Sequence, residues 1–395
     1  MAGAASGKLE LATIVRAHAA PLRAGQNLSG AQLKALRAIE RCRTAQLGGH
    51  IARCNQCAAQ QFHYHSCRNR HCPKCQTLAK ERWLQSRRTE LLPVPYFHLV
   101  FTLPHEINAL AQGNPRLIYG LLFAAASETL IEFGENPRWL GGSIAATLVL
   151  HTWGQTLTHH PHVHALVAGG ALHAEGGWIA PRRGFLFPVK ALSPVFRGKF
   201  LGALSKLLEQ GCLKLAGSTT ALAQPQACRE WMARLRAKPW VVYAKQSLSG
   251  PEQVLDYLGR YTHKAAISNE RLLAMDEQGN VRFGYRDRVR GNQRKTMQLP
   301  ATEFLARFLT HVLPRGFMRI RHYGILANRA KHDKLAAART ALGVAAPSPV
   351  APESVPAFWL RVTGIDITLC PNCRVGRLSV VRSILPLRAY RARPP

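Results

Sequence analysis

The chain has 395 residues, with 53 Lys and Arg against 21 Asp and Glu, and therefore a formal net charge of +32. At about 150 residues per domain this length corresponds to two or three domains, and a hydrophobic content of 47% is typical of a globular protein. A folded protein this basic needs a polyanionic partner, and nucleic acid is the usual one. The longest apolar stretch, Leu117–Ala126, has 10 residues, too few for a membrane span, and no signal peptide is evident. We therefore exclude a secreted or membrane protein and expect a cytoplasmic one.

The predicted elements mix helices and strands. Residues 1–28 suggest a loose arm, and a capping box formed by Ser29 and Gln32 predicts a helix over 30–43. Periodicity and turn residues predict the following elements: a helix over 81–92, a strand over 97–103, one or two helices over 107–133, strands over 144–157 and 163–172, a helix from 193, a strand over 240–244, a helix over 250–263, and a hairpin of 267–275 with 281–285. Because strands and helices do not alternate strictly, we expect an α+β fold with a largely antiparallel sheet.

Five of the ten cysteines fall between Cys54 and Cys75, in a pattern typical of metal binding rather than disulfides. Two Cys-x-x-Cys pairs, 14 residues apart, predict one tetrahedral zinc site, with the ligands Cys54, Cys57, Cys72 and Cys75. Between the pairs lie Cys67, His65 and His71, any of which could replace a ligand or join a second site; alternatively, Cys67 is a small buried hydrophobe. Two further cysteines, Cys370 and Cys373, form only a half-site, since two thiolates cannot close a structural zinc site.

A run of histidines, 159–164, predicts a second metal site. In an extended segment His162 and His164 point to the same face and can hold a divalent cation, Mg²⁺ or Mn²⁺. A hairpin turning at 158–161 would bring Gln155, on the preceding strand, beside them as the third ligand. The other candidates for this ligand are His160, His151 and His98. The alternative interpretation is a histidine-rich turn near a basic surface.

Two tyrosines follow the histidines on a predicted helix. Tyr257 and Tyr261 are four residues apart and so share one helical face, and Lys264 lies one turn further on. A phenol with a pKa of about 10 attacks a phosphodiester only if a metal polarises the phosphate and cations stabilise the phenolate. Because Lys264 lies on the next turn after Tyr261 and could stabilise its phenolate, we expect Tyr261 to act first and Tyr257 second. Alternatively, one of the tyrosines packs against the sheet.

The segment 281–340 carries 14 Lys and Arg against 3 Asp and Glu. Its basic residues stand beside Phe283 and Tyr285, and such a mixture suits single-stranded DNA, where phosphates find charge and bases find stacking surfaces. A plain solvated basic surface is the alternative. Together with two basic residues of the cysteine cluster, the expected DNA contacts are Arg68, Arg70, Arg286, Arg288, Arg290, Arg294 and Lys295.

Taken in order, four motifs resemble one known family. They are the cysteine cluster ending at 65–75, the histidine run 160–164, the tyrosine segment 257–269 and the basic segment 307–324. This arrangement is similar to that of the bacterial insertion-sequence transposases of the IS-ninety-one family, which are HUH enzymes proposed to move by a rolling-circle route. The resemblance covers about residues 30–340.

The resemblance implies a zinc-binding module followed by an HUH endonuclease-like antiparallel sheet with helices. It implies cleavage and rejoining of single-stranded DNA at the element ends and target through a 5′-phosphotyrosine, with structural zinc and catalytic Mg²⁺ or Mn²⁺. Such an enzyme would act in the bacterial cytoplasm at the nucleoid. We expect four segments: 1–92 with the arm and zinc module, 93–300 with the catalytic domain, 301–346 as a basic extension, and 347–395 as a linker and short Cys-x-x-Cys tail.

Two functions of other classes compete with this interpretation. A non-enzymatic, zinc-dependent DNA-binding regulator would explain the charge and the cysteines but would leave the histidines and tyrosines without a role. A metal hydrolase that activates water at the histidines would cut DNA without a covalent intermediate.

Overall fold

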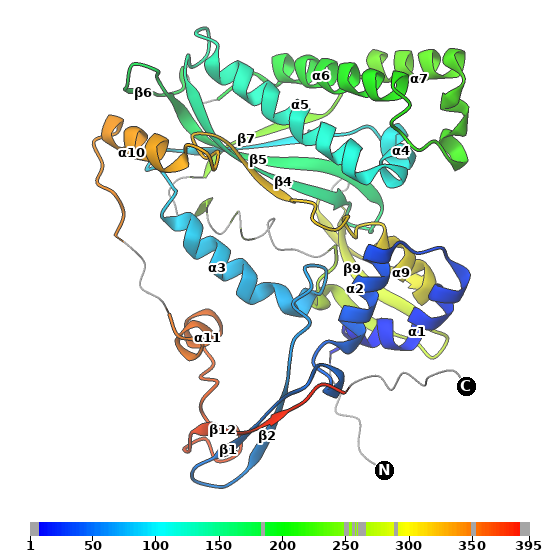
Figure 1. Ribbon diagram of the computed structural model, residues 1–395, viewed down its shortest axis with the longest axis vertical. Helices are drawn as coiled ribbons and strands as arrows, with labels where there is room; N and C mark the ends of the chain where they lie inside the picture. Colours follow the sequence, from blue (N-terminus) through cyan, green and yellow to red (C-terminus); the bar gives the residue numbers. More distant parts are fainter. Residues whose placement is uncertain are drawn as a thin grey trace. The chain divides into compact units, whose positions relative to one another are not determined.

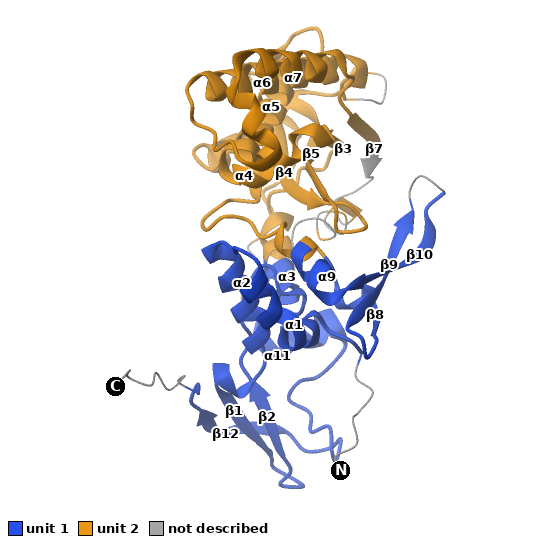
Figure 2. Ribbon diagram, turned by 90° about the vertical axis from the view of Figure 1, so that its right-hand side faces the viewer, with its two compact units in different colours: residues 1–82, 267–306, 349–395 blue, residues 83–266, 307–348 orange. Residues whose placement is uncertain are grey.

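The computed structural model describes residues 8–182, 186–248, 266–287, 291–348 and 353–387, together with Gln253, Val254, Tyr257 and Gly259. The chain forms two compact units, shown in blue and orange in Figure 2. The first unit comprises residues 1–82, 267–306 and 349–395, and the second comprises residues 83–266 and 307–348. These boundaries differ from the four segments expected from the sequence, because the C-terminal residues belong to the same unit as the N-terminal ones.

The first unit contains two three-stranded antiparallel sheets and several helices. One sheet has the order β12-β1-β2 and the other the order β10-β9-β8. The strands are β1 (Gly49–Cys54), β2 (Gln60–Tyr64), β8 (Leu272–Met275), β9 (Asn280–Asp287), β10 (Gln293–Pro300) and β12 (Leu378–Ile384). The helices are α1 (Leu11–Gly25), α2 (Gly30–Arg41) and α11 (Val355–Thr363), while α3 (Gln76–Arg88) and α9 (Ala301–Leu309) cross the boundary between the units.

Helix α2 confirms the predicted capping box, since Ser29 Oγ accepts a hydrogen bond from the Gln32 amide and Gln32 Oε1 accepts one from the Ser29 amide. The loose arm expected over residues 1–28 is wrong, because α1 occupies most of it. Its buried Leu11, Ile14 and Val15 recur at helical spacing and pack toward α2. Basic and small residues between these apolar positions hid that period in the sequence.

The second unit is built on one antiparallel sheet with the strand order β11-β4-β5-β3-β7, and a short β6 pairs with β5. Its strands are β3 (Tyr96–Thr102), β4 (Ser143–Trp153), β5 (His159–Leu172), β6 (Trp178–Ile179), β7 (Val242–Leu248) and β11 (Ile320–Gly324). Its helices are α4 (Asn108–Gly113), α5 (Pro115–Glu135), α6 (Val189–Glu209), α7 (Pro225–Ala237) and α10 (Lys331–Ala341). The expected α+β class with antiparallel strands is confirmed.

The two faces of this sheet differ in chemistry. Alternate strand residues such as Phe101, Leu148 and Val163 are buried in the main core cluster, together with residues of α5 and α6, which lie over that face in Figure 1. Because side chains alternate along a strand, the residues between them point to the opposite face. That face carries the histidines of the candidate metal site described below. Helix α5 is long and apolar enough to cross a membrane by length and composition alone, but its buried residues belong to the main core cluster.

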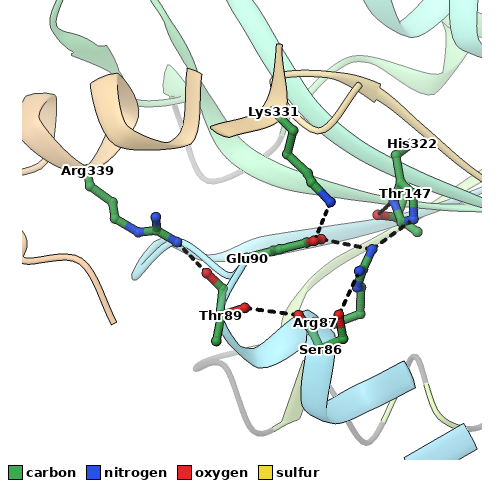
Figure 3. Close-up of polar contacts among 8 residues, drawn as sticks. All are labelled: Ser86, Arg87, Thr89, Glu90, Thr147, His322, Lys331 and Arg339. Atoms are coloured by element: carbon green, nitrogen blue, oxygen red, sulfur yellow. Dashed lines mark hydrogen bonds and ion pairs between the residues drawn. The ribbon is translucent and has the colours of Figure 1, made fainter. Parts of the chain in front are cut away.

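A polar network within the second unit holds the C-terminal end of α3 in place (Figure 3). Arg87 forms an ion pair with Glu90 (2.9 Å) and donates a hydrogen bond to His322 Nε2 (3.1 Å), and Lys331 reaches the other Glu90 oxygen (2.6 Å). Because guanidinium only donates, His322 Nε2 accepts, and Nδ1 therefore donates to Thr147 Oγ1 at 3.0 Å. Burial, with Arg87 and Lys331, lowers the pKa of His322 to about 4, which keeps the ring neutral.

Candidate active site and metal centres

Three histidines meet on the polar face of the sheet. Ring nitrogens of His151, His162 and His164 lie within 4.8 Å of one another. His151 on β4 stands directly opposite His162 on β5, and the Nε2 atoms of His162 and His164 are 3.1 Å apart. The structure thus brings the two predicted ligands together and supplies His151, one of the alternatives, as the third histidine.

Gln155 lies elsewhere in the hairpin than the sequence suggested. Strand β4 ends at Trp153, and the chain turns over residues 154–158, where the Gly154 amide donates to the carbonyl of Thr158 at 2.9 Å. Gln155 therefore lies in the turn and not on the preceding strand as expected. The turn begins at Gly154 and not at Thr158 as expected, with Leu157 in the left-handed region (φ 61°), and this register places His151 at the position opposite His162.

The turn is held in place by a buried histidine that the sequence analysis did not single out. His311 is 3% exposed, and its Nε2 atom is 3.0 Å from the carbonyl oxygen of Leu157. A carbonyl only accepts, so Nε2 donates, and His311 Nδ1 accepts from the Thr152 hydroxyl at 3.2 Å. Burial lowers the pKa of His311 to about 3, which keeps it neutral. No local pattern marks this residue, because both of its partners lie far from it in the sequence.

Two of the three rings in the cluster, those of His162 and His164, have an outer partner that fixes their orientation. His162 Nδ1 donates to the carbonyl of His160 at 2.7 Å, so in the neutral ring the Nε2 lone pair is directed to the cluster. His164 Nδ1 lies 2.9 Å from His98 Nε2, and the two rings stack with centroids 5.1 Å apart. Burial and the nearby Lys245 lower the pKa of His98 to about 4, so the neutral His98 ring can accept a hydrogen bond from His164 Nδ1. His162 and His164 therefore present lone pairs suited to a metal ion.

A tyrosine of the predicted helix lies beside this cluster. Tyr257 is half-buried, and its ring centroid is 4.7 Å from that of His98. Together with the fully buried Val254, it packs against a second hydrophobic cluster that includes Leu166 of β5. Tyr261 and Lys264, the other predicted catalytic residues, lie outside the described residues.

The cysteines form two groups instead of the one expected. The first group consists of Cys42, Cys67, Cys72 and Cys75. Its Sγ–Sγ distances are 3.5 Å for Cys42–Cys75, 3.5 Å for Cys67–Cys75 and 3.8 Å for Cys42–Cys72. Tetrahedral zinc with Zn–S bonds of about 2.3 Å requires about 3.8 Å between sulfurs, so these four thiols fit zinc.

The predicted grouping of Cys54 and Cys57 with Cys72 and Cys75 is therefore wrong. Strands β1 and β2 form a hairpin whose turn carries Cys54 and Cys57, whereas Cys42 precedes the hairpin and Cys67 follows it. A strand of this length separates the turn from the open end by roughly 17–20 Å, too far for a shared ion. The spacing of the cysteines in the sequence could not reveal this grouping, because the β1–β2 hairpin was not predicted. Among the described residues, neither His65 nor His71 belongs to either four-cysteine group.

Within the first cysteine group, the neighbouring thiols favour the thiolate form of Cys75. Hydrogen bonds from the thiols of Cys42 and Cys67 lower the pKa of Cys75 and favour its thiolate.

Directly after two of these cysteines, Arg43 (φ 56°) and Arg68 (φ 50°) adopt left-handed backbone conformations. Such conformations are strained for residues other than glycine, and they concentrate where a site constrains the chain.

The expected DNA contacts are distributed over two parts of the first unit. Arg286 on β9 and Arg294 on β10 are both exposed and stand directly opposite each other in the antiparallel pair. Like charges directly opposite each other are destabilising in a sheet. Lys295 points to the other face, where it pairs with Asp287 at 2.8 Å. Arg288 and Arg290 lie outside the described residues.

The remaining residues of the predicted DNA interface differ in their exposure to solvent. Phe283 is fully buried, so the expectation that it stacks on bases is wrong; it packs on Phe304 instead. Arg68 is exposed, whereas Arg70 is half-buried, and burial lowers its pKa.

Comparison with known proteins agrees with these features. The family model described as "Putative transposase" matches residues 145–334, and the one described as "Transposase zinc-binding domain" matches residues 14–103. The "Putative transposase y4qJ" of Sinorhizobium fredii is 47% identical over 377 residues, which cover 94% of this chain and 94% of that protein. The "Transposase for insertion sequence element IS801" of Pseudomonas savastanoi pv. phaseolicola is 30% identical over 314 residues, 78% of this chain and 73% of that protein.

These matches and the cysteine-rich module define a DNA transposase with a zinc-binding domain. The chain belongs to the IS-ninety-one family of insertion-sequence transposases. Among solved structures, the metal-bound conjugative relaxase TrwC in complex with OriT DNA aligns at 14% identity and a TM-score of 0.23, covering 43% of this chain and 74% of that chain. A TrwC complex with a 27-mer DNA aligns at 18% identity and the same score, covering 44% of this chain and 68% of that chain.

Proposed function

We propose that this transposase cuts and rejoins single-stranded DNA through a tyrosine ester, with a divalent cation held by His151, His162 and His164. The observation that carries this proposal is the three-imidazole cluster on one sheet face, with the Tyr257 ring against His98. Three nitrogen ligands favour Mn²⁺ over Mg²⁺, because Mg²⁺ prefers oxygen. Bound at this cluster, the cation supplies positive charge next to the scissile phosphate.

The chain's own residues position the cation and supply the nucleophile. His98 and the His160 carbonyl would hold the imidazoles of His164 and His162, respectively, with their lone pairs toward the metal. The phenol oxygen of Tyr261 then bonds to phosphorus as the phosphorus–O3′ bond breaks; the phenol proton is lost and the 3′ oxygen gains one. Lys264 stabilises the phenolate. The resulting 5′-phosphotyrosine keeps the ester energy, so rejoining to a 3′-OH needs no ATP.

The basic surfaces are proposed to bind single-stranded DNA. The facing Arg286 and Arg294 of the β9–β10 hairpin bind its phosphates, with Arg68 of the cysteine-rich module as a further contact. Strand transfer at element ends and target, in a rolling-circle manner, would follow in the bacterial cytoplasm at the nucleoid.

The test is incubation of the full-length protein with labelled single-stranded DNA carrying an element end and Mn²⁺, followed by a denaturing gel. A covalent protein–DNA band is expected. Cleavage without that band would favour the metal hydrolase, and no cleavage would favour the DNA-binding regulator.

The ligand assignment has its own test. His151→Ala should raise the Mn²⁺ concentration needed for half-maximal nicking by more than about tenfold, because one ligand is lost. His332→Ala is the matched control, since this α10 histidine has a 97% exposed side chain. If Gln155→Ala shifts the Mn²⁺ titration and His151→Ala does not, the third ligand is Gln155.

A further inference from the structure

We propose that Cys54, Cys57, Cys370 and Cys373 form a second structural zinc site, which fastens the C-terminal segment to the N-terminal module. The zinc-binding family model matches residues 14–103 and so does not include Cys370 and Cys373. The site is independent of the proposed cleavage chemistry, because it lies wholly in the first unit.

The four thiols have the geometry of a metal site. Their sulfur atoms all lie within 4.8 Å of one another, with 3.7 Å for Cys54–Cys373 and 3.7 Å for Cys57–Cys370. These two distances match the spacing of about 3.8 Å expected between sulfurs around tetrahedral zinc. They are far longer than the roughly 2.05 Å of a disulfide. Four cysteine ligands close a zinc site, which two alone cannot do.

The two halves of the site share one backbone feature. The residue after each Cys-x-x-Cys pair adopts a left-handed conformation: Ala58 with φ 55° and Arg374 with φ 58°. Backbone amides donate to the sulfurs, from Gln56 to Cys54 (3.4 Å) and from Gly376 to Cys373 (3.3 Å). Hydrogen bonds of this kind stabilise the thiolates that zinc requires.

The two halves are also fixed against each other by the chain around them. Strand β12 pairs with β1, so that Leu378 stands opposite Cys54, and the two strands lie side by side in Figure 1. The Asn55 side-chain oxygen accepts from the Arg377 amide at 2.7 Å. A Cβ at Gly376 would overlap Cys54 Sγ, so only glycine fits there. The site is therefore preorganised before a metal binds.

The proposal predicts two zinc ions per chain rather than one. Metal analysis of the full-length protein, purified without chelator, should give two, and the Cys370→Ser/Cys373→Ser double variant should give one. The matched control is Cys212→Ser/Cys228→Ser, whose cysteines belong to neither group among the described residues; it should keep two. A single zinc in the unmodified protein, or two in the Cys370→Ser/Cys373→Ser variant, would overturn the proposal.

A measurement on the unmodified protein covers the case in which the double variant fails to fold. Cys57 and Cys212 are both exposed, so without a metal both should react with iodoacetamide. We expect mass spectrometry to find Cys212 alkylated at once, while Cys57, Cys370 and Cys373 stay protected until a chelator is added. Protection that yields to a reductant but not to a chelator would identify disulfides and refute the zinc site. Alkylation of Cys57 as fast as Cys212 would refute it too.

Discussion

The protonation of single imidazole rings decides what the histidine cluster can do. His162 and His164 present lone pairs to the cluster only because a carbonyl oxygen and a neutral His98 take up their other nitrogens. The sequence could predict that these two histidines share a face, since alternation along a strand is a local rule. It could not predict His98 as the partner of His164, because this contact joins residues far apart in the sequence and depends on strand pairing.

Under the proposed mechanism the two tyrosines act at different steps. We expect Tyr261→Phe to abolish the first covalent adduct, because the proposal assigns Lys264 to stabilise the Tyr261 phenolate. Tyr257→Phe should still form the adduct but fail in complete transposition, because the proposal assigns Tyr257 to the second cleavage or strand transfer. Adduct formation on denaturing gels and a transposition assay in cells measure the two steps.

The outcomes that would contradict this order are specific. Loss of the first adduct in Tyr257→Phe alone would reverse the roles. Normal transposition by Tyr257→Phe would assign Tyr257 a packing role against His98 and Leu166 instead.

Among the elements, those with local signals were predictable and those completed by distant pairing were not. The capping box indicated the start of α2, and the break between α4 and α5 falls at Asn114 and Pro115 as expected. By contrast, β12 is a short strand near the C-terminal end of the chain, and its partner β1 lies near the N-terminal end. The cysteine groups were misassigned for the same reason, since hairpin geometry rather than spacing brings the sulfurs together.

The basic residues of the β9–β10 hairpin lead to a prediction about DNA binding. Arg286→Ala or Arg294→Ala should weaken single-stranded DNA binding across sequences and reduce the slope of log affinity against log salt by about 1 each, because each removes a phosphate contact. Lys295→Ala is the control on the same hairpin. Its ammonium is already paired with Asp287 on the other face, so a smaller change is expected. Filter binding over a salt series measures the slopes, and equal effects of all three variants would contradict the proposed surface.

Across the whole molecule, buried neutral histidines make stability depend on pH. Burial lowers the pKa of His311 to about 3 and that of His322 to about 4, from 6.5 in the unfolded chain. Below pH 6.5 the unfolded chain therefore binds more protons than the folded one. The stabilising contribution is fully present above that pH and is lost as the pH falls toward 4.

The second unit should therefore unfold at a lower urea concentration at about pH 5 than at about pH 7.5. The measurement is the midpoint of its urea unfolding transition at the two pH values. His322→Gln should reduce this difference, whereas His332→Ala, which changes an exposed histidine, should leave it intact. A midpoint that stays constant or rises on acidification would contradict the neutral, buried state of these rings.

The pairing of β1 with β12 has a consequence for synthesis on the ribosome. One edge of β1 stays open until residues 378–384 have emerged, although the synthesis of β1 itself is complete at Cys54. The first unit therefore cannot finish folding while translation is still in progress through the second. A copy of the gene interrupted by a premature stop codon before residue 378 would yield a protein whose N-terminal sheet is incomplete, however intact its histidine cluster.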